Sequence, residues 1–178
     1  MRNMLAMLAA LTVVACTDGT PTEVAGGGAG GIAPVLSPAS DGAPPTIFNT
    51  QLRSALEVPA CNSESKGHAH LKVFQDGTIE SMVKIKNKAD ETVRFGHIHH
   101  LDPGEETGPI IWWLSLPPGF NHNLTDRHIE FRETAVFVSN PHFTSEAAAL
   151  AELLDDPSSF YVNFHSNACP GGFARGFL

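Results

Sequence analysis

The pair His97 and His99 is the part of the chain whose residue types and spacing could do chemistry. In an extended strand, side chains two residues apart project from the same face, with their Cα atoms about 6.5 Å apart. Two imidazoles placed in this way can bind a single metal ion, and histidine is the commonest metal ligand. The alternative is a pair of polar residues on a solvated strand face. The spacing alone leaves both interpretations open.

The segments that must position these histidines are short strands separated by turns. From residue 47 onward, apolar and polar residues alternate in short runs, as in His68 to Val73 and in Ile79 to Lys86. Gln75-Asp76-Gly77 predicts a hairpin between those two runs. The expected strands cover residues 48–56, 67–73, 79–86, 95–100, 109–116, 128–131, 134–138 and 160–165. This pattern predicts an all-β, antiparallel Greek-key sandwich.

One short helix is expected near residues 144–155. Thr144 or Ser145 can cap it, Glu146 suits its first turn, and Ala147 to Leu154 have high helix propensity. Leu150, Leu153 and Leu154 are expected to form its apolar stripe. The helix is then expected to pack over one end of the sandwich.

Charge and motif content exclude several classes of function. The chain has 178 residues and a formal net charge of −8, which argues against a nucleic-acid partner because phosphate binding needs a basic surface. The same charge disfavours anionic lipid surfaces. The sequence has no nucleophile elbow, no phosphate-binding loop and no Cys-x-x-Cys pair. It therefore contains no strong enzyme motif.

The first 46 residues are expected to lie outside the folded domain. Residues 1–15 combine Arg2 with the apolar run Leu5 to Val14, which is too short to span a bilayer and is typical of a signal peptide. Its end, Val13-Val14-Ala15-Cys16, resembles the bacterial lipoprotein signal, in which the cysteine is acylated. Residues 16–46 are rich in glycine and proline, which predicts a flexible tether.

This resemblance implies an exported protein. It would be anchored through its N-terminal lipid to a membrane of the bacterial cell envelope, at the outer membrane or cell surface. The alternative is simple secretion with a free Cys16.

Residues 47–178 resemble the CHRD domain, which is found in chordin and in many secreted bacterial proteins. The motifs that carry the resemblance are Leu56-Glu57-Val58-Pro59, Gly67, His97-Ile98-His99, Gly108-Pro109-Ile110, Tyr161-Val162-Asn163-Phe164-His165, Pro170-Gly171-Gly172 and Arg175-Gly176. The chain departs from the family pattern at Cys61, at Cys169 and at Phe173-Ala174. CHRD domains have no established biochemical activity. The resemblance therefore implies a non-catalytic binding or interaction module with an envelope or extracellular protein partner.

A weaker resemblance links the chain to copper/zinc superoxide dismutases, which are immunoglobulin-like Greek-key sandwiches. It rests on His97 and His99, on His165 in a later strand, and on Arg175 in a Gly-rich segment. It implies one cluster of His97, His99 and His165 that binds copper or zinc, and an Arg175 that steers an anion. The long loop with the metal-bridging histidine is missing, because only residues 101–108 stand in its place. A superoxide dismutase-like oxidoreductase therefore stays a less favoured alternative to metal binding without catalysis.

The candidate cluster also has a purely structural interpretation. The histidines could hydrogen-bond to one another, to Asn163 or to Glu57 and so order the edge of the sandwich. Glu57 could orient a ligand or Arg175, although an exposed carboxylate at a strand end is its ordinary interpretation. If metal binds, it requires neutral imidazoles, so affinity is expected to fall as the pH drops through about 6.5.

The remaining cysteines are expected to form a disulfide. With Cys16 acylated, Cys61 and Cys169 are left, and an even number in an exported protein indicates a bridge. The family pattern places the two near the terminal regions of the domain, so the bridge would tie its ends together. The alternative is two unrelated thiols.

Overall fold

The computed structural model describes residues 42–88, 91–115 and 124–178. The predicted signal peptide, Cys16 and almost all of the predicted tether lie outside the described residues. Within the described part of the chain, no helix is both long enough and apolar enough to cross a membrane.

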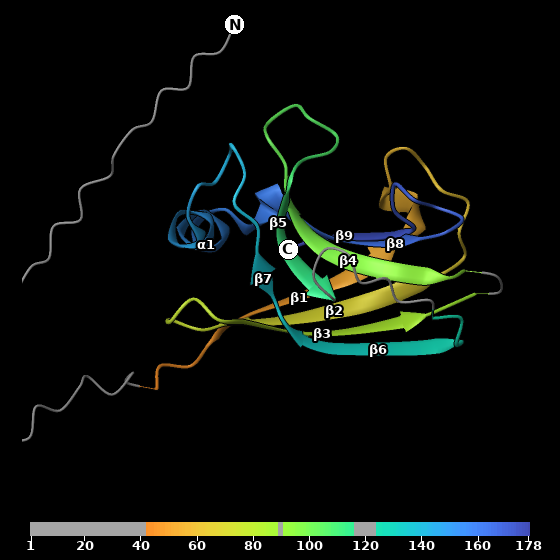
Figure 1. Ribbon diagram of the computed structural model, residues 1–178, viewed down its shortest axis with the longest axis horizontal. Helices are drawn as coiled ribbons and strands as arrows, with labels where there is room; N and C mark the ends of the chain where they lie inside the picture. The colour runs from red at the N-terminus through yellow and green to blue at the C-terminus, as the bar shows by residue number, and fades with distance from the viewer. Residues whose placement is uncertain (1–41, 89–90, 116–123) are drawn as a thin grey trace, which may run out of the picture. The chain divides into compact units, whose positions relative to one another are not determined.

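Nine antiparallel strands and one α-helix make up the described domain (Figure 1). The elements are β1 Thr46–Arg53, β2 Lys66–Val73, β3 Ile79–Lys86, β4 Val93–His100, β5 Ile110–Ser115, β6 His128–Thr134, β7 Val136–Phe137, α1 Glu146–Asp155, β8 Phe160–Ser166 and β9 Ala174–Phe177. The predicted all-β class with one short helix is confirmed.

The strands form a continuous sheet in the order β6-β3-β2-β1-β9-β8-β4-β5-β7, which folds over into two layers (Figure 1). The layers join where β1 meets β9 through a single register pair, Arg53 with Arg175. On the other side, β6 runs almost directly into β7, which pairs with β5. The Ser81 hydroxyl of β3 donates to the carbonyl of Glu133 at 2.9 Å, close to β5. The two layers therefore form a sandwich that is connected along both sides.

Alternating side chains explain why these strands pack face to face. On β2, the apolar residues Ala69, Leu71 and Val73 are buried, whereas the intervening positions are half-buried. On the opposite layer, Ile98 of β4 and Val162 of β8 are fully buried and lie in register with each other. Apolar burial on this scale is the main favourable term in folding.

The helix begins and packs largely as predicted. The Ser145 side chain accepts a hydrogen bond from the backbone N–H of Ala148 at 3.3 Å, as an N-cap residue should. Ala149 and Leu153 are buried against the sandwich. The expected apolar stripe is wrong at Leu154, which is 50% exposed, because the buried face of the helix is centred on Ala149 and Leu153.

Candidate functional site

The three candidate histidines lie on one face of the β4–β8 strand pair. In the register of these strands, His97 lies opposite Asn163 and His99 opposite Tyr161. His165 lies opposite Phe95, one pleat further along the same face. Because Ile98 and the other intervening residues point into the core, the histidines face away from it. The predicted convergence of His97, His99 and His165 is therefore found.

The imidazole rings are close enough to share one ion. Candidate ligand atoms of all three histidines lie within 4.8 Å of one another. Nδ1 of His97 is 3.2 Å from Nε2 of His165. The His97 and His99 ring centroids are 5.4 Å apart, and Trp113 packs edge-on against His97 at 4.1 Å.

Loops cover this face, so the histidines are buried as fully as a core residue. His97 is 2% exposed, and His99 and His165 are each 8% exposed. Nδ1 of His99 lies 3.0 Å from the carbonyl of Gly108, and Nδ1 of His165 lies 2.9 Å from the carbonyl of Pro170. A carbonyl can only accept, so both rings carry their proton on Nδ1 and present an Nε2 lone pair to the cluster.

Burial keeps these imidazoles neutral at ordinary pH. Loss of solvation lowers the pKa of His97 to about 2, with the neighbouring His165 and His99 adding to the effect. Burial also lowers the pKa of His99 to about 4 against the opposing hydrogen bond to Gly108, and it lowers the pKa of His165. Burial therefore moves the pH at which protons would compete with a metal to below 6.5, the value expected for a solvated imidazole.

The disulfide predicted between Cys61 and Cys169 is confirmed. It joins residues separated by 108 positions, with their Cα atoms 6.1 Å apart. Cys169 immediately precedes Pro170, whose carbonyl accepts from His165. The bridge therefore ties the segment after β1 to the loop that holds one of the three imidazoles.

Arg175 fastens the loops that cover the site. It is 2% exposed, and its guanidinium lies 3.7 Å from the ring centroid of Tyr161. Its Nη2 donates to the carbonyl of Glu106 at 3.0 Å, and its Nη1 donates to the carbonyl of Leu56 at 3.4 Å. Tyr161 in turn stacks on His99 with ring centroids 4.8 Å apart. Arg175 thus connects two covering segments to the histidine face.

Glu57 is buried, contrary to the exposed strand-end position expected for it. It is 4% exposed, because the chain after the 3₁₀ turn Ser54–Leu56 turns in under the covering loops. Burial raises the pKa of its carboxyl from 4.5 to about 7, against the opposing charge of Arg175 and the nearby amide of Asn163. A Cβ atom on Gly172 would come within 3.0 Å of both Glu57 and Asn163, so glycine is required there for these two side chains to fit.

The aromatic walls of the site were not anticipated from the sequence. Phe95, Trp113 and Tyr161 all contact one or more of the three histidines. Strand alternation could have indicated two of these aromatic residues. Phe95 lies two residues before His97 on β4, and Tyr161 lies four residues before His165 on β8, so each shares a strand face with a histidine.

The other histidine pair, His68 and His70, does not form a comparable cluster in the described residues. Nδ1 of His70 lies 2.9 Å from the side-chain oxygen of Asn49, at the exposed surface. Both rings are half-buried on β2.

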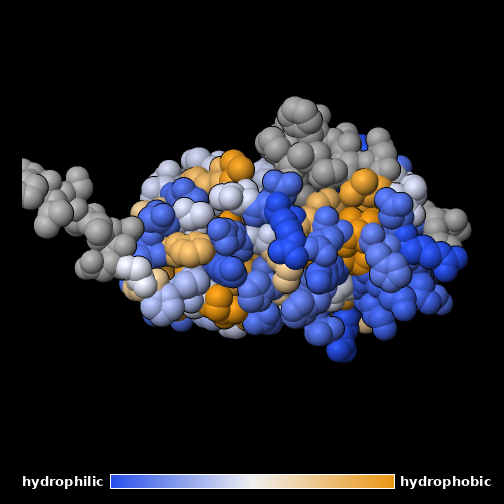
Figure 2. Space-filling view, turned by 90° about the horizontal axis from the view of Figure 1, so that it is seen from below, coloured by the Kyte–Doolittle hydropathy of each residue, from blue (hydrophilic) through white to orange (hydrophobic). Residues whose placement is uncertain are grey.

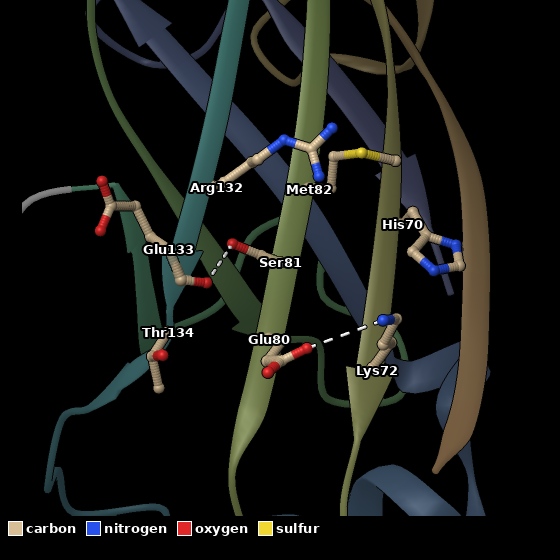
Figure 3. A pocket seen from close by; sticks show the side chains of 8 residues that line it. All are labelled: His70, Lys72, Glu80, Ser81, Met82, Arg132, Glu133 and Thr134. Carbon is tan, nitrogen blue, oxygen red and sulfur yellow. Dashed lines mark hydrogen bonds and ion pairs between the residues drawn. The ribbon is translucent and has the colours of Figure 1, made fainter. Parts of the chain in front are cut away.

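A depression of about 380 Å³ lies beside His70 on the outer face of β2, β3 and β6 (Figure 3). Its charged side chains already pair with each other, as Lys72 does with Glu80 at 3.7 Å. The surrounding surface is mostly polar, with hydrophobic residues in separate patches (Figure 2). This face presents no converging set of unpaired groups among the residues described.

The comparisons with known proteins agree with the resemblance seen in the sequence. No curated protein and no solved structure matches the chain. A family model for the CHRD domain matches residues 48–178, which span all nine strands except the first two residues of β1. The covered histidine face lies entirely inside this match. The chain therefore belongs to the CHRD domain family.

Proposed function

We propose that this CHRD domain is a non-catalytic binding module whose ligand is one transition-metal ion, copper or zinc, held by His97, His99 and His165. The observation that carries the proposal is the convergence of three buried imidazoles whose candidate ligand atoms lie within 4.8 Å of one another. Three imidazoles with an open fourth position form a donor set that both ions accept.

The separation of two ligand atoms supports this proposal. Two nitrogens that each lie 2.0–2.1 Å from a tetrahedral ion are about 3.3 Å apart. Nδ1 of His97 and Nε2 of His165 are 3.2 Å apart. A hydrogen bond between these two atoms would give the same distance. His99 therefore decides between a bound ion and a simple hydrogen bond. Nε2 of His99 is buried and has no hydrogen-bond partner in the described structure, which a bound ion would provide.

The outer contacts of the rings support it as well. Metal-binding histidines usually donate their other N–H to a backbone carbonyl or carboxylate, which fixes the tautomer and the ring orientation. His99 and His165 do this with Gly108 and Pro170. Because their pKa values are lowered by burial, the rings need lose no proton before they bind an ion at neutral pH.

The closure of the site favours binding over catalysis. The three histidines are nearly inaccessible, and Arg175 engages backbone carbonyls of both covering segments. An enzyme acting on superoxide would need an open coordination position that a small anion can reach. We therefore assign the ion a non-catalytic role in which it is held and does not readily exchange.

We further propose that Cys16 is acylated and holds the domain at a membrane of the bacterial cell envelope. Support comes from Val13-Val14-Ala15 directly before it and from the Gly/Pro-rich segment after it. A lipid anchor of this kind would let the domain meet an envelope or extracellular protein partner.

The metal proposal is tested by titrating Cu(II) and Zn(II) into tag-free protein with a calorimeter. The variant is His97→Gln/His99→Gln, and the matched control is His68→Gln/His70→Gln, a second pair with the same spacing on β2. Circular dichroism first establishes that each variant folds. The proposal expects wild type and control to bind the ion at His97, His99 and His165 with equal affinity. In the site variant, the affinity of this site should fall at least about 100-fold, whether or not ions bind elsewhere in the chain.

A second readout identifies the ligands directly. In the Cu(II)-loaded wild type, electron paramagnetic resonance is expected to show coupling to imidazole nitrogens, and the site variant is expected to lose that signal. Equal binding by all three proteins, or binding by none of them, would assign His97, His99 and His165 a structural role.

A further inference from the structure

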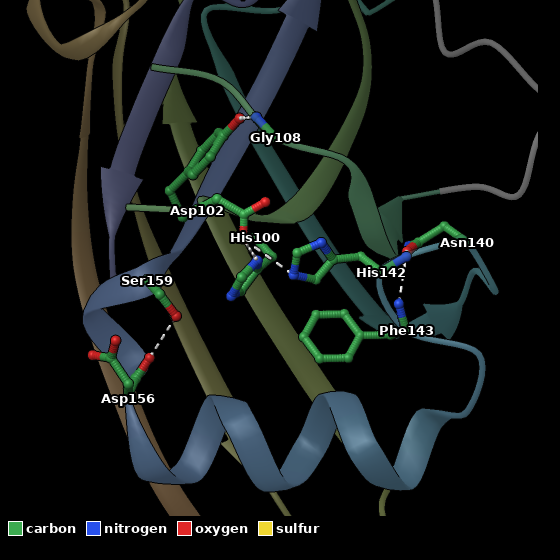
Figure 4. A network of polar contacts seen from close by, with 9 residues as sticks. His100, Asp102, Gly108, Asn140, His142, Phe143, Asp156 and Ser159 are labelled. Carbon is green, nitrogen blue, oxygen red and sulfur yellow. Dashed lines mark hydrogen bonds and ion pairs between the residues drawn. The ribbon is translucent and has the colours of Figure 1, made fainter. Parts of the chain in front are cut away.

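A second group of metal-binding side chains meets at the far end of β4. His100 is the last residue of that strand, Asp102 follows in the next turn, and His142 comes from the segment between β7 and α1 (Figure 4). Because side chains alternate along a strand, His100 faces away from the side that carries His97 and His99. It packs against Phe143 and Phe160, near α1.

The two imidazoles both lie near one carboxylate oxygen of Asp102. Nε2 of His142 is 3.2 Å from Oδ1 of Asp102, and Nδ1 of His100 is 3.7 Å from the same atom. The two imidazole centroids are 4.6 Å apart. Donor atoms bound to one ion at 2.0–2.2 Å are separated by about 3–4 Å, so these distances suit ligands of a single ion.

An unsatisfied buried nitrogen points into this group. His100 is 5% exposed, and its Nδ1 has no hydrogen-bond partner among the described residues. Buried polar atoms nearly always have a hydrogen-bond partner, so a buried ring nitrogen without one needs an explanation. An ion between His100, Asp102 and His142 would provide the missing partner.

The backbone around His142 is held in place independently of any ion. The side-chain oxygen of Asn140 accepts hydrogen bonds from the backbone N–H groups of His142 and Phe143, each at 2.9 Å. The side-chain nitrogen of Asn140 donates to the carbonyl of Ile110 at 3.0 Å. This arrangement fixes the loop to β5 and presents the His142 ring to Asp102.

The surroundings favour a cation and allow it to exchange. The three side chains line a hollow of about 480 Å³, whose rim includes Glu152 and Asp156. The side chains of His142 and Asp102 are 34% and 47% exposed, in contrast to the closed cluster on the other face. Two imidazoles select a transition metal over calcium or magnesium, which prefer oxygen ligands.

We propose that His100, Asp102 and His142 form a second metal site, which binds a divalent transition-metal ion of the zinc type and leaves one position to water. The ion would tie the turn after β4 to the loop before α1. The alternative is an ion pair between Asp102 and His142 with no metal, and it predicts a different response to substitution.

The test uses Co(II), whose visible absorption reports its ligands, together with Zn(II) in competition. The tag-free full chain carries His97→Gln/His99→Gln, so that the cluster on the other face is removed. Into this background we place His142→Ala or Asp102→Asn, with His128→Ala on the exposed start of β6 as the matched control. Asp102→Asn keeps an oxygen that can accept from His142 but removes the charge that a metal needs.

The proposal expects one Co(II) per chain in the background and in the His128→Ala control. Affinity should fall by at least about tenfold in both His142→Ala and Asp102→Asn. If the background fails to fold, the same two substitutions in the wild-type chain should each lower the Zn(II) stoichiometry by one. Absence of Co(II) binding in a folded background, or equal binding in all variants, would overturn the proposal. This holds whether or not His97, His99 and His165 bind metal.

Discussion

Replacing Glu57 by glutamine should change how stability depends on pH. The carboxyl of Glu57 has a pKa of 4.5 when unfolded and about 7 in the folded protein, because the covering loops bury it. Between these two values the folded state holds a proton that the unfolded state has released. Unfolding therefore releases a proton in this window, and the contribution of Glu57 to stability falls as the pH rises through it.

The size of the effect follows from the difference between the two pKa values. Each pH unit in this window costs about 1.4 kcal/mol, so the full penalty above pH 7 is about 3.4 kcal/mol at most. Relaxation and water access around the carboxyl reduce this, and we expect about 1.5–3 kcal/mol. Glutamine cannot ionise. The free energy of unfolding of Glu57→Gln minus that of wild type should therefore rise by this amount from about pH 4.5 to about pH 7 and then level off.

The measurement is urea unfolding of chelator-treated protein at intervals from about pH 4 to about pH 8. Taking the difference between variants cancels the opposite contribution of His97 and His99, whose lowered pKa values make wild type lose stability as the pH falls. The matched control is Glu64→Gln, an exposed carboxylate on the same connecting segment. A difference that stays flat across the range would show that Glu57 is ionised in the folded state, with Arg175 dominating over burial.

The remaining predictions concern packing, cross-linking and anchoring. Gly96→Ala places a Cβ closer than 3.0 Å to three ring atoms of the buried Phe164, so it should cost about 1–3 kcal/mol and lower the melting temperature, whereas Gly42→Ala, with open space around it, should not. The double variant Cys61→Ser/Cys169→Ser removes a link across 108 residues, so its free energy of unfolding should fall by up to about 4.7 kcal/mol. Unreduced, denatured wild type should show no titratable thiol from this pair, and two such thiols would contradict the bridge. Cys16→Ser should leave the chain uncleaved or release it from the membrane fraction, as judged by mass spectrometry and fractionation, and an unchanged mass in the membrane fraction would exclude acylation of this residue.

Strand period accounts for most of what the sequence predicted correctly. Alternation placed His97, His99 and His165 on non-core faces, and the register of β4 with β8 then brings those faces together. The Ser145 cap and the helix were readable because capping and propensity are local properties. The pairing of Cys61 with Cys169 was predicted from the count of cysteines together with the expectation that the protein is exported.

The features that escaped prediction depend on loops returning from distant parts of the chain. Glu57 is buried because Arg175, far along the sequence, holds the carbonyl of Leu56 next to it. The His100, Asp102 and His142 group needs the loop before α1 to lie beside the end of β4, which no local pattern encodes. The pKa values of the histidines likewise depend on how deeply the covering loops bury them.

The junction between β6 and β7 has a consequence for how other molecules can attach to this domain. The two edges of the sheet are β6 and the two-residue β7, and consecutive residues of the chain connect them. An incoming peptide extends a sheet by pairing with a long, bare edge, which β7 is too short to offer. On β6, the exposed side chains of Glu130 and Arg132 put charges on the edge strand, a feature that discourages pairing with another strand. The described edges of the sheet therefore disfavour strand addition and edge-to-edge aggregation.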